Sequence, residues 1–373
     1  MQTATPATPV SVAHVTGESG FSGGEVQLFL LLEGLRARGD RSLLVCPPGS
    51  RAEAEASRRG FATRSVPMRS DLSLGAALAI RRVLRETKPD LVHLHSGRAN
   101  WLGGLAAWSL DLPTLTTRRM DRRVKRGAGT RLLYGVIARR AVAISPAVRA
   151  CLLDGGVAPE IVRLIPSAVD AAVLAPRRSR DAVRRAEGLA DGAVCALALT
   201  ALVPRKGLDV LLDALALPAL REIPLVLWIA GDGPERAKLE AQAASRGVAA
   251  RVRFLGRRDD KADLLAACDL LVLPSRREGL GVAALEAMAC ARPVVASRVG
   301  GLADAVADGV TGLLVEPEDP EALATALARL ASDAGLRARL GTSGPARIAE
   351  RFAASQMCDA YARLYRELLA ESA

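Results

Sequence analysis

The segment from residue 270 to residue 304 constrains the fold more strongly than any other part of this 373-residue chain. Residues 270–273 form a short apolar run, which is typical of a buried parallel strand. A proline and a serine end this run, a turn with two glycines follows, and residues 282–290 have the composition of a helix. This order predicts that the helix begins at the carboxyl edge of a parallel sheet. Open α/β sheets bind ligands at that edge, and a helix N-terminus attracts anions.

The same alternation of apolar strands and helices runs along the whole chain. In the first half we expect strands at residues 10–15, 41–46, 61–66, 91–94, 114–116, 141–144 and 162–165. In the second half we expect them at residues 194–199, 225–230, 252–255, 270–273, 294–296 and 312–315. A plausible helix follows each strand, so the predicted fold class is α/β, with parallel sheets covered by helices.

The chain is too long for one ordinary core, so we expect two Rossmann-like domains that face a cleft. The predicted boundaries are residues 1–172 for the first domain and 173–352 for the second. Residues 353–373 contain a final amphipathic pattern. The polar segment 176–180, rich in proline and arginine, is the best candidate for a linker.

Positive charge is concentrated in the first half of the chain. The net charge is +11, and residues 1–170 hold 24 Lys and Arg against 14 Asp and Glu, whereas the remainder holds 27 against 26. This asymmetry indicates an anionic partner for the first half, with an arginine-rich coding bias as an alternative source of part of it. Aromatic residues make up only 3% of the chain, which leaves few stacking platforms for single-stranded nucleic acid.

The cysteines and the apolar runs indicate in which cellular compartment the protein lies. The six cysteines are dispersed, so we interpret them as small buried side chains in a reducing environment. Residues 1–9 are polar and do not resemble a secretory signal, and no apolar run approaches the ~18–20 residues that span a bilayer. We therefore expect a cytoplasmic protein, with peripheral association on the inner face of the cytoplasmic membrane as an option.

Two carboxylates flank the predicted helix N-terminus. Glu278 lies in the turn and Glu286 in the second turn of the helix, and because helical side chains tilt toward the N-terminus, both can reach one cavity. A carboxylate repels phosphate, so we expect these two to hold sugar hydroxyls while the helix end and nearby cations take phosphates. The alternative is that Glu278 only favours the helix dipole and Glu286 only solvates a helix face.

The spacing Glu-x7-Glu, followed by Ala-Met-Ala, Pro-Val-Val-Ala and Gly-Gly, resembles the retaining nucleotide-sugar glycosyltransferases of family 4. The resemblance implies the GT-B fold, with the nucleotide sugar in the C-terminal domain, the acceptor in the N-terminal domain and a final helix that crosses back onto the N-terminal domain. It also implies that Glu278 orients the sugar and Glu286 the ribose hydroxyls. To the same nucleotide-sugar site we assign Gly279, Leu280, Gly281 and Val282.

Other motifs of the second half match the same family. Lys206 corresponds to a lysine that contacts the donor diphosphate. The family often has an arginine five positions earlier, where this chain has Ala201, so Arg205 is the candidate replacement. A solvated helix start is the alternative for this pair. Further candidates for nucleotide binding are the Gly-x-Gly-Pro turn and the residue after Phe-Leu-Gly, namely Gly231, Gly233 and Arg257.

The first half offers a glycine pair and three histidines. Gly23 and Gly24 open the first helix, and in the family this loop reaches the donor; a plain tight turn is the alternative. His95 ends a strand and is a candidate catalytic residue, with a structural role as the alternative. A metal would need ligands beyond the histidines, and no Asp-x-Asp occurs, so we expect no metal and no other cofactor. Where the family often has a further histidine in the cleft, this chain has Arg119, which is the candidate to take that place on the acceptor side, with His95 as the alternative key residue there.

Residues 118–140 contain nine cations and one acid. The apolar residues near the end of this segment favour a basic amphipathic helix that lies on anionic lipid. An equally weighted alternative is an ordinary helix in which the aliphatic parts of the arginine side chains cover the hydrophobic core. To an acceptor or membrane face we assign Arg119, Arg122, Arg123, Lys125 and Arg126.

These observations favour a retaining, metal-independent glycosyltransferase. It would move a hexosyl or heptosyl group from a nucleotide diphosphate sugar to an anionic or lipid-linked glycan, such as lipopolysaccharide or a related cell-envelope glycoconjugate. One alternative is a nucleotide-sugar epimerase or isomerase, for which the sequence offers few acid–base groups. Another is a non-catalytic basic protein that binds nucleic acid, against which the few aromatic residues and the nearly neutral second half argue.

Overall fold

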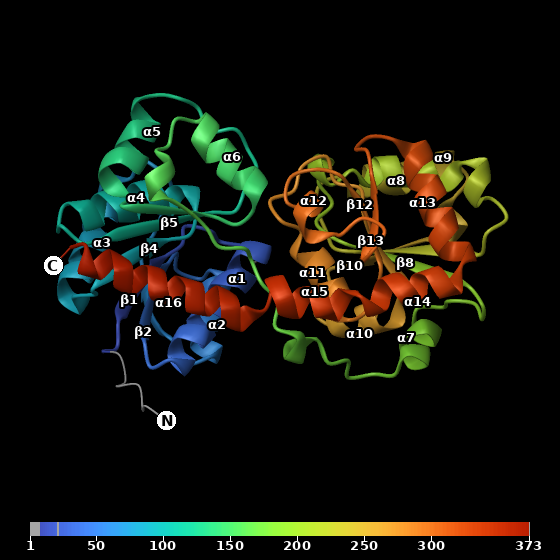
Figure 1. Ribbon diagram of the computed structural model, residues 1–373, viewed down its shortest axis with the longest axis horizontal. Helices are drawn as coiled ribbons and strands as arrows, with labels where there is room; N and C mark the ends of the chain where they lie inside the picture. Colours follow the sequence, from blue (N-terminus) through green and yellow to red (C-terminus); the bar gives the residue numbers. More distant parts are fainter. Residues whose placement is uncertain (1–7, 21, 373) are drawn as a thin grey trace. The chain divides into compact units, whose positions relative to one another are not determined.

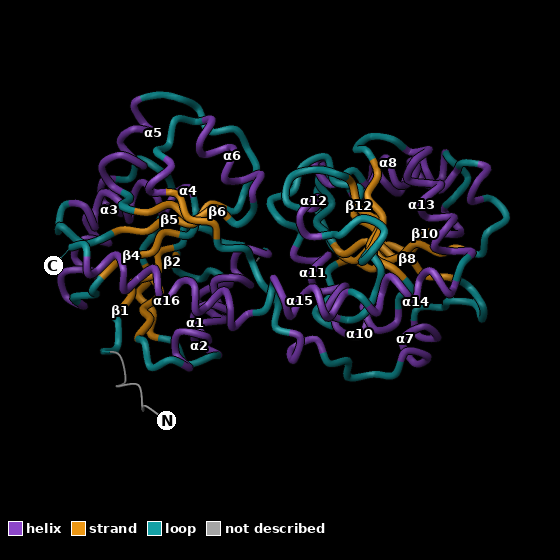
Figure 2. Tube along the Cα trace, in the orientation of Figure 1, coloured by secondary structure: helices purple, strands orange, loops and turns teal. Residues whose placement is uncertain are grey.

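The computed structural model describes residues 8–20 and 22–372, so most of the polar N-terminal segment considered above lies outside the described residues. The chain forms two compact units. Unit 1 extends to Ser167 and includes the last helix from Ala354, and unit 2 is Ala168–Ala353. In each unit the strands, orange in Figure 2, form a parallel sheet with helices around it, which confirms the α/β fold class.

Unit 1 is built on a seven-stranded sheet with the order β3-β2-β1-β4-β5-β6-β7. Its strands are β1 (Ser11–Val15), β2 (Arg41–Cys46), β3 (Ala62–Ser65), β4 (Leu91–Leu94), β5 (Thr114–Arg118), β6 (Arg140–Ala143) and β7 (Val162–Leu164). Its helices are α1 (Gly23–Ala37), α2 (Arg51–Arg58), α3 (Leu74–Thr87), α4 (Gly97–Trp108), α5 (Ala128–Leu132), the π-helical turn η1 (Leu133–Ile137), α6 (Pro146–Asp154) and the short 3-10 helix η2 (Pro159–Ile161). The strand order reverses between β1 and β4, which makes this pair the switch point of the sheet.

Serine caps begin most helices of unit 1. Each of these side chains accepts a hydrogen bond from a backbone N–H of the first helical turn, which satisfies a donor that the helix itself leaves without a partner. The caps of α1, α2, α3, α4 and α6 are Ser22, Ser50, Ser73, Ser96 and Ser145. The apolar residues of β1 and β4 are buried between the helix layers, as expected for a parallel sheet.

The last helix, α16 (Ala354–Ala370), belongs to unit 1 and packs against α1 (Figure 1). The contact is close because a Cβ at Gly34 would lie 2.2 Å from Cys358 Sγ. Farther along the helix, the Tyr365 hydroxyl lies 2.7 Å from His93 Nδ1 in β4. A helix from the end of the sequence therefore completes the core of the first unit.

Unit 2 is built on a six-stranded sheet with the order β10-β9-β8-β11-β12-β13. Its strands are β8 (Val194–Leu199), β9 (Leu225–Ala230), β10 (Val252–Gly256), β11 (Leu270–Leu273), β12 (Val294–Ser297) and β13 (Gly312–Val315). Its α-helices are α7 (Arg180–Ala186), α8 (Leu208–Ala216), α9 (Arg236–Ser245), α10 (Lys261–Ala267), α11 (Val282–Ala289), α12 (Leu302–Ala305), α13 (Pro320–Ser332), α14 (Ala334–Thr342) and α15 (Gly344–Arg351). Short 3-10 helices are η3 (Ala171–Leu174), η4 (Pro204–Lys206), η5 (Pro218–Leu220) and η6 (Ala249–Arg251). The strand order reverses between β8 and β11, so the switch point of this sheet lies there.

The prediction that residues 176–180 form a linker is wrong, because this segment is bound within unit 2. The backbone N–H groups of Arg177 and Arg178 donate to Asp263 Oδ1 at 2.6 and 3.2 Å, and Arg178 Nε donates to Asp263 Oδ2 at 2.9 Å. The polar composition that suggested a linker is therefore used in contacts within unit 2. The first division between the units falls between Ser167 and Ala168, ahead of the expected boundary at residue 172.

The helix expected near the end of residues 118–140 is present but short, and it does not include the first cations of that segment. Residues 119–126 are neither helix nor strand, and the helical part is limited to α5 and the π-helical turn η1. Gly127 precedes α5, and two further glycines lie within the short helical stretch, where they weaken helix formation. The four cations at positions 122, 123, 125 and 126 are exposed on an irregular loop. Across the part of the chain that the structure describes, no helix has both the length and the apolar character needed to cross a membrane.

Candidate functional site

The switch point of unit 2 brings two loops together. β8 and β11 are parallel neighbours, with Ala196 paired to Leu270, so the segments that follow these strands leave the same edge of the sheet. The Arg276 backbone N–H donates to the Arg205 carbonyl at 2.9 Å, which ties one loop to the other. The Arg276 guanidinium also binds both carboxylate oxygens of Asp209, at 2.7 and 2.8 Å. The loop after β11 is therefore fixed against the start of α8.

Lys206 and Glu278 form an ion pair across this switch point. Lys206 comes from the loop after β8 and Glu278 from the loop after β11. Their side chains are 12% and 14% exposed, so each charge is largely removed from water and depends on its partner. The structure thus brings together the two residues that the sequence assigned to the diphosphate and to the sugar.

The first turn of α11 opens beside this ion pair. The helix begins at Val282, and its N-cap is Gly281, where φ is 84° and where a Cβ would lie 2.4 Å from Leu302 Cδ2, so only glycine fits. Glycine has no side chain to cap the helix, which leaves the first N–H groups available to an anion. The Gly301 N–H donates to the Glu278 carbonyl at 3.0 Å and holds the turn in place.

Glu286, in the second turn of α11, is paired with Lys261, the first residue of α10. Glu286 is only 6% exposed, whereas the Lys261 side chain is 33% exposed. Sequence reasoning missed Lys261, because its contact depends on the packing of two helices. A signal was present, since a lysine in the first turn of a helix is unfavourable to the helix dipole unless a nearby carboxylate compensates.

The other residues of unit 2 that the sequence assigned to nucleotide binding or catalysis take no part in these two ion pairs. Arg205 is exposed, and the Arg257 side chain is 49% exposed and lies 3.8 Å from Asp259. Close packing explains why glycine is needed at positions 231 and 233, whether or not they bind a nucleotide. A Cβ at these two positions would lie 1.8 and 2.3 Å from the carbonyl oxygens of residues 200 and 202, in the loop after β8.

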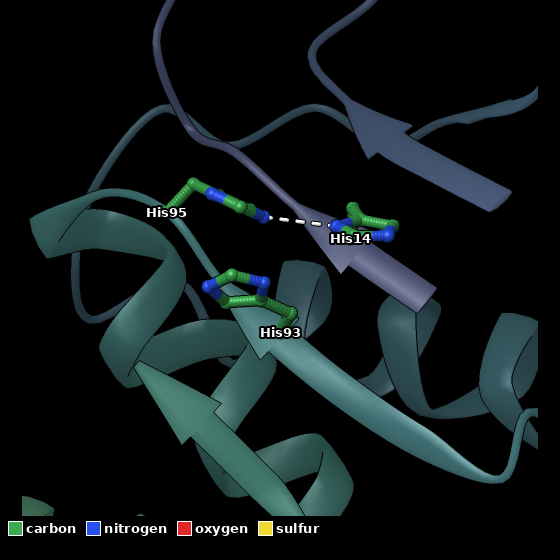
Figure 3. A group of neighbouring side chains, drawn as sticks. All are labelled: His14, His93 and His95. Atoms are coloured by element: carbon green, nitrogen blue, oxygen red, sulfur yellow. Dashed lines mark hydrogen bonds between the residues drawn. The ribbon is translucent and has the colours of Figure 1, made fainter. Parts of the chain in front are cut away.

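The switch point of unit 1 holds all three histidines (Figure 3). His14 of β1 and His93 of β4 are register partners in the sheet, and His95 follows β4. His14 Nδ1 lies 3.0 Å from His95 Nε2. His93 places its two ring nitrogens 2.7 Å from the hydroxyls of Tyr365 and Thr117. From the sequence we considered His14 only as a weak further metal ligand, whereas the pairing of β1 with β4 brings it next to the other two.

Arg119 is turned inward, toward His95, and away from the exposed cations with which it was grouped. Its guanidinium nitrogens lie 3.3 and 3.4 Å from His95 Nδ1. Because a guanidinium only donates, His95 Nδ1 must accept, so neutral His95 carries its proton on Nε2 and donates to His14 Nδ1. Burial, and then the Arg119 cation, lower the pKa of His14 to about 3, which keeps that ring neutral near pH 7.

The three imidazoles offer metal ligands by position, since one nitrogen of each lies within 4.8 Å of the others. Their nitrogens are largely committed, however. His14 and His95 bond to each other, and His93 bonds to two hydroxyls. A metal on His95 Nε2 would place the proton on Nδ1, facing the Arg119 donors, and would put a dication beside a guanidinium. The donor set therefore fits a hydrogen-bonded network better than a metal centre.

Comparison with known proteins agrees with this geometry. A family model described as "Glycosyltransferase Family 4" matches residues 21–173, and one described as "Glycosyl transferases group 1" matches residues 179–347. A D-inositol 3-phosphate glycosyltransferase from Streptomyces bingchenggensis is 34% identical over 307 residues, which are 75% of this chain and 67% of that protein. The lipopolysaccharide core biosynthesis glycosyltransferase LpsE from Rhizobium meliloti is 39% identical over 163 residues, 43% of this chain and 46% of that protein.

A solved structure shows the same fold. HepE from Anabaena, in complex with UDP and glucose, has a TM-score of 0.83 and 23% identity over 95% of this chain and 99% of that one. Two parallel α/β units, each with a switch point at the carboxyl edge of its sheet, define the GT-B architecture. Within that class, the chain belongs to glycosyltransferase family 4, and its second half matches the group 1 glycosyl transferases.

The Lys261–Glu286 pair gives a test of the site's electrostatics that does not depend on any ligand. Lys261→Met leaves a buried carboxylate without its cation, so the free energy of unfolding should fall by about 1–3 kcal/mol. The double variant Lys261→Met with Glu286→Met should recover most of that loss. Urea unfolding measures both, with Lys238→Met, whose side chain is 71% exposed, as the control. Equal stability of wild type and Lys261→Met would show that the pair is not formed in solution.

Proposed function

We propose that this glycosyltransferase moves a hexosyl or heptosyl group from a nucleoside diphosphate sugar to an anionic or lipid-linked glycan acceptor, with retention of configuration. The observation that carries the proposal is the Lys206–Glu278 ion pair at the switch point of unit 2. An ammonium suits a diphosphate and a carboxylate suits sugar hydroxyls, so the pair supports a site where the diphosphate and the sugar would meet. The likeness to HepE, which binds UDP and glucose, supports a donor of this kind.

The chemistry follows from where charge develops. As the bond between the anomeric carbon and the diphosphate breaks, negative charge builds on the diphosphate and positive charge on the sugar ring. Lys206 and the first N–H groups of α11 are fixed donors placed to stabilise the leaving diphosphate. Glu278 would orient the sugar through its hydroxyls, and Glu286, held by Lys261, would receive the ribose hydroxyls. The acceptor hydroxyl would attack the anomeric carbon as the bond to the diphosphate oxygen breaks, and its proton would pass to the departing diphosphate, which leaves the glycoside and a nucleoside diphosphate. Retention is the expectation that comes from the family resemblance.

Unit 1 would bind the acceptor. Two observations support an anionic acceptor: the excess positive charge of the first half of the sequence, and the exposed cations at positions 122, 123, 125 and 126. Nearby, Leu132 and Val136 are exposed apolar side chains, 40% and 51% accessible, on α5 and η1. Cations beside exposed apolar groups suit a lipid-linked acceptor at an anionic membrane surface on the cytoplasmic side. The names of the matched relatives, for inositol phosphate and lipopolysaccharide core transfer, point to acceptors of the same kind.

The first prediction for this function separates the two glutamates. Glu278→Gln should abolish transfer while leaving nucleotide affinity largely intact, because its contact would be to the sugar. Glu286→Gln should mainly weaken nucleotide binding, because its contact would be to the ribose. Nucleotide release on mixing with panels of donors and acceptors measures transfer, and calorimetry measures affinity. Glu240→Gln, on the exposed surface of α9, is the control. Wild-type turnover in both variants would remove the pair from the mechanism.

The second prediction concerns metal ions. Transfer should continue in EDTA, because Lys206 and the α11 N-terminus supply positive charge at the diphosphate and the sequence contains no Asp-x-Asp motif. The measurement is the initial rate of nucleotide release with and without chelator, after the detection system has been shown to tolerate it. Complete loss of activity that Mg²⁺ or Mn²⁺ restores would contradict metal-independent transfer.

The third prediction concerns the exposed basic loop. Changing Arg122, Arg123, Lys125 and Arg126 together to Gln should lower binding to anionic vesicles and raise the acceptor KM. Binding to the vesicles should also weaken as the salt concentration rises, because the electrostatic screening length falls to ~8 Å at physiological ionic strength. Donor affinity should stay unchanged, since none of the four substituted residues belongs to the nucleotide site that we propose.

Co-sedimentation with neutral and anionic vesicles at two salt concentrations measures this effect. The control replaces the exposed Arg82 and Arg85 of α3 by Gln. Equal binding to both vesicle types, unaffected by salt or by the four substitutions, would leave the loop with a structural role alone.

A further inference from the structure

The Lys206–Glu278 ion pair is a contact that a bound donor has to open. In the function proposed above, Lys206 contacts the diphosphate and Glu278 contacts the sugar, so the donor lies between the two side chains. In this structure the Lys206 ammonium binds the Glu278 carboxylate directly, which leaves no room for a ligand between them. Once the pair has opened, other contacts have to keep the two loops at a fixed separation.

Arg276 supplies such a contact from within the loop that carries Glu278. The Arg276 backbone N–H donates to the Arg205 carbonyl at 2.9 Å, and Arg276 Nη1 donates to the Pro204 carbonyl at 2.7 Å. Both carbonyls belong to η4, the short 3-10 helix that ends at Lys206. Arg276 therefore holds the backbone that leads into Lys206, through carbonyl groups that a ligand on the Lys206 side chain leaves in place.

The guanidinium of Arg276 is oriented by a forked contact with Asp209, in the first turn of α8. Arg276 Nη1 and Nη2 donate to the two carboxylate oxygens of Asp209 at 2.8 and 2.7 Å. A forked pair fixes the direction of the guanidinium as well as its distance, which a single hydrogen bond does not. The hydrogen bonds from Arg276 are the main cause that lowers the pKa of Asp209, so this carboxylate is charged near pH 7. The third bond, from Arg276 Nε to Glu318 at 2.9 Å, adds less because the Glu318 side chain is 64% exposed.

Close backbone packing sets the same separation directly after Lys206. A Cβ at Gly207 would lie 2.0 Å from the Pro274 carbonyl oxygen, and Gly207 has a φ of 64°. The loop after β8 and the loop after β11 thus meet backbone to backbone at Gly207, and through the Arg276 side chain at η4. Neither contact uses the charges that the donor would take, so both can persist when the ion pair opens.

We propose that Arg276 is a positioning residue for the transfer reaction, which holds Lys206 at a fixed distance from Glu278 while the donor separates the two side chains. The positioning role rests on the function proposed above and deepens it, since it names the residue that preorganises the diphosphate contact. Preorganisation matters because a charged donor stabilises a developing charge best when it is already in place. Arg276 acts through the backbone of η4 and not through a contact with the donor.

Calorimetry of the intact protein tests this role by comparing a nucleoside diphosphate with the monophosphate of the same base. The pairs are UDP and UMP, GDP and GMP, ADP and AMP, and dTDP and dTMP, and the pair with the tightest diphosphate is used. The ratio of the two affinities isolates the contact that the second phosphate adds. In Arg276→Gln we expect this ratio to fall by about threefold to tenfold, because a charge-assisted hydrogen bond that loses its alignment loses part of its strength. Affinity for the monophosphate should stay as in wild type.

Further variants separate positioning from general damage. Lys206→Ala gives the fall in the ratio that complete loss of the lysine causes. Asp209→Asn should lower the ratio in the same direction, and the double variant Arg276→Gln with Asp209→Asn should be no worse than Arg276→Gln alone, because the two residues act as one contact. The matched control is Arg246→Gln, since Arg246 is an exposed arginine that also pairs with an aspartate of α8, Asp213. The control should bind both nucleotides as wild type does.

An unchanged ratio in a folded Arg276→Gln protein would contradict the positioning role, and so would an equal loss of affinity for both nucleotides, which indicates general destabilisation. If Arg276→Gln does not fold, Asp209→Asn decides by the same ratio. If wild type binds no nucleoside diphosphate, the function proposed above falls and the positioning role falls with it. If wild type binds one with a ratio that depends on Lys206 but not on Arg276, only the positioning role is contradicted.

Discussion

The parallel pairing of β8 with β11 is the constraint on which the unit 2 site depends. Because the sheet reverses its order between these two strands, the chain leaves them toward opposite sides and their following loops meet at one edge. Lys206 and Glu278, 72 positions apart in the sequence, form an ion pair there. The same edge carries the start of α11, a helix whose N-cap is a glycine and which has no side-chain cap. One positive group, one negative group and a helix N-terminus thus share one edge of the sheet.

Unit 1 uses the same sheet plan with different side chains. Its switch point lies between β1 and β4, and the residues there are three histidines and an inward-facing arginine. The last helix completes this arrangement, since the Tyr365 and Tyr361 hydroxyls contact His93 and Thr117 at 2.7 and 2.9 Å. The polar network of unit 1 therefore depends on residues from both ends of the chain.

Sequence reasoning succeeded where the signal was local. The strand at Leu270–Leu273 and the helix from Val282 were predicted because an apolar run, a glycine turn and a helix-forming segment follow one another directly. It failed where a contact depends on tertiary packing. Lys261 meets Glu286 only because α10 and α11 pack together, and the supposed linker is held by Asp263, which lies 85 and 86 residues away in the sequence. Arg119 was assigned both to the place of a family histidine near His95 and to the basic face, and the structure places its guanidinium beside His95. Composition gives a charge but not the direction in which a side chain points, so the sequence alone did not decide between the two.

We propose that Lys206 and the start of α11 form the diphosphate site of a nucleotide-sugar donor. Calorimetric titration of the intact protein with UDP, GDP, ADP and dTDP tests this assignment. We expect one of the four to bind with 1:1 stoichiometry, and Lys206→Ala to weaken that binding by about tenfold or more while the exposed Lys238→Ala does not. Binding of none of the four, or equal affinity in wild type and Lys206→Ala, would contradict the claim.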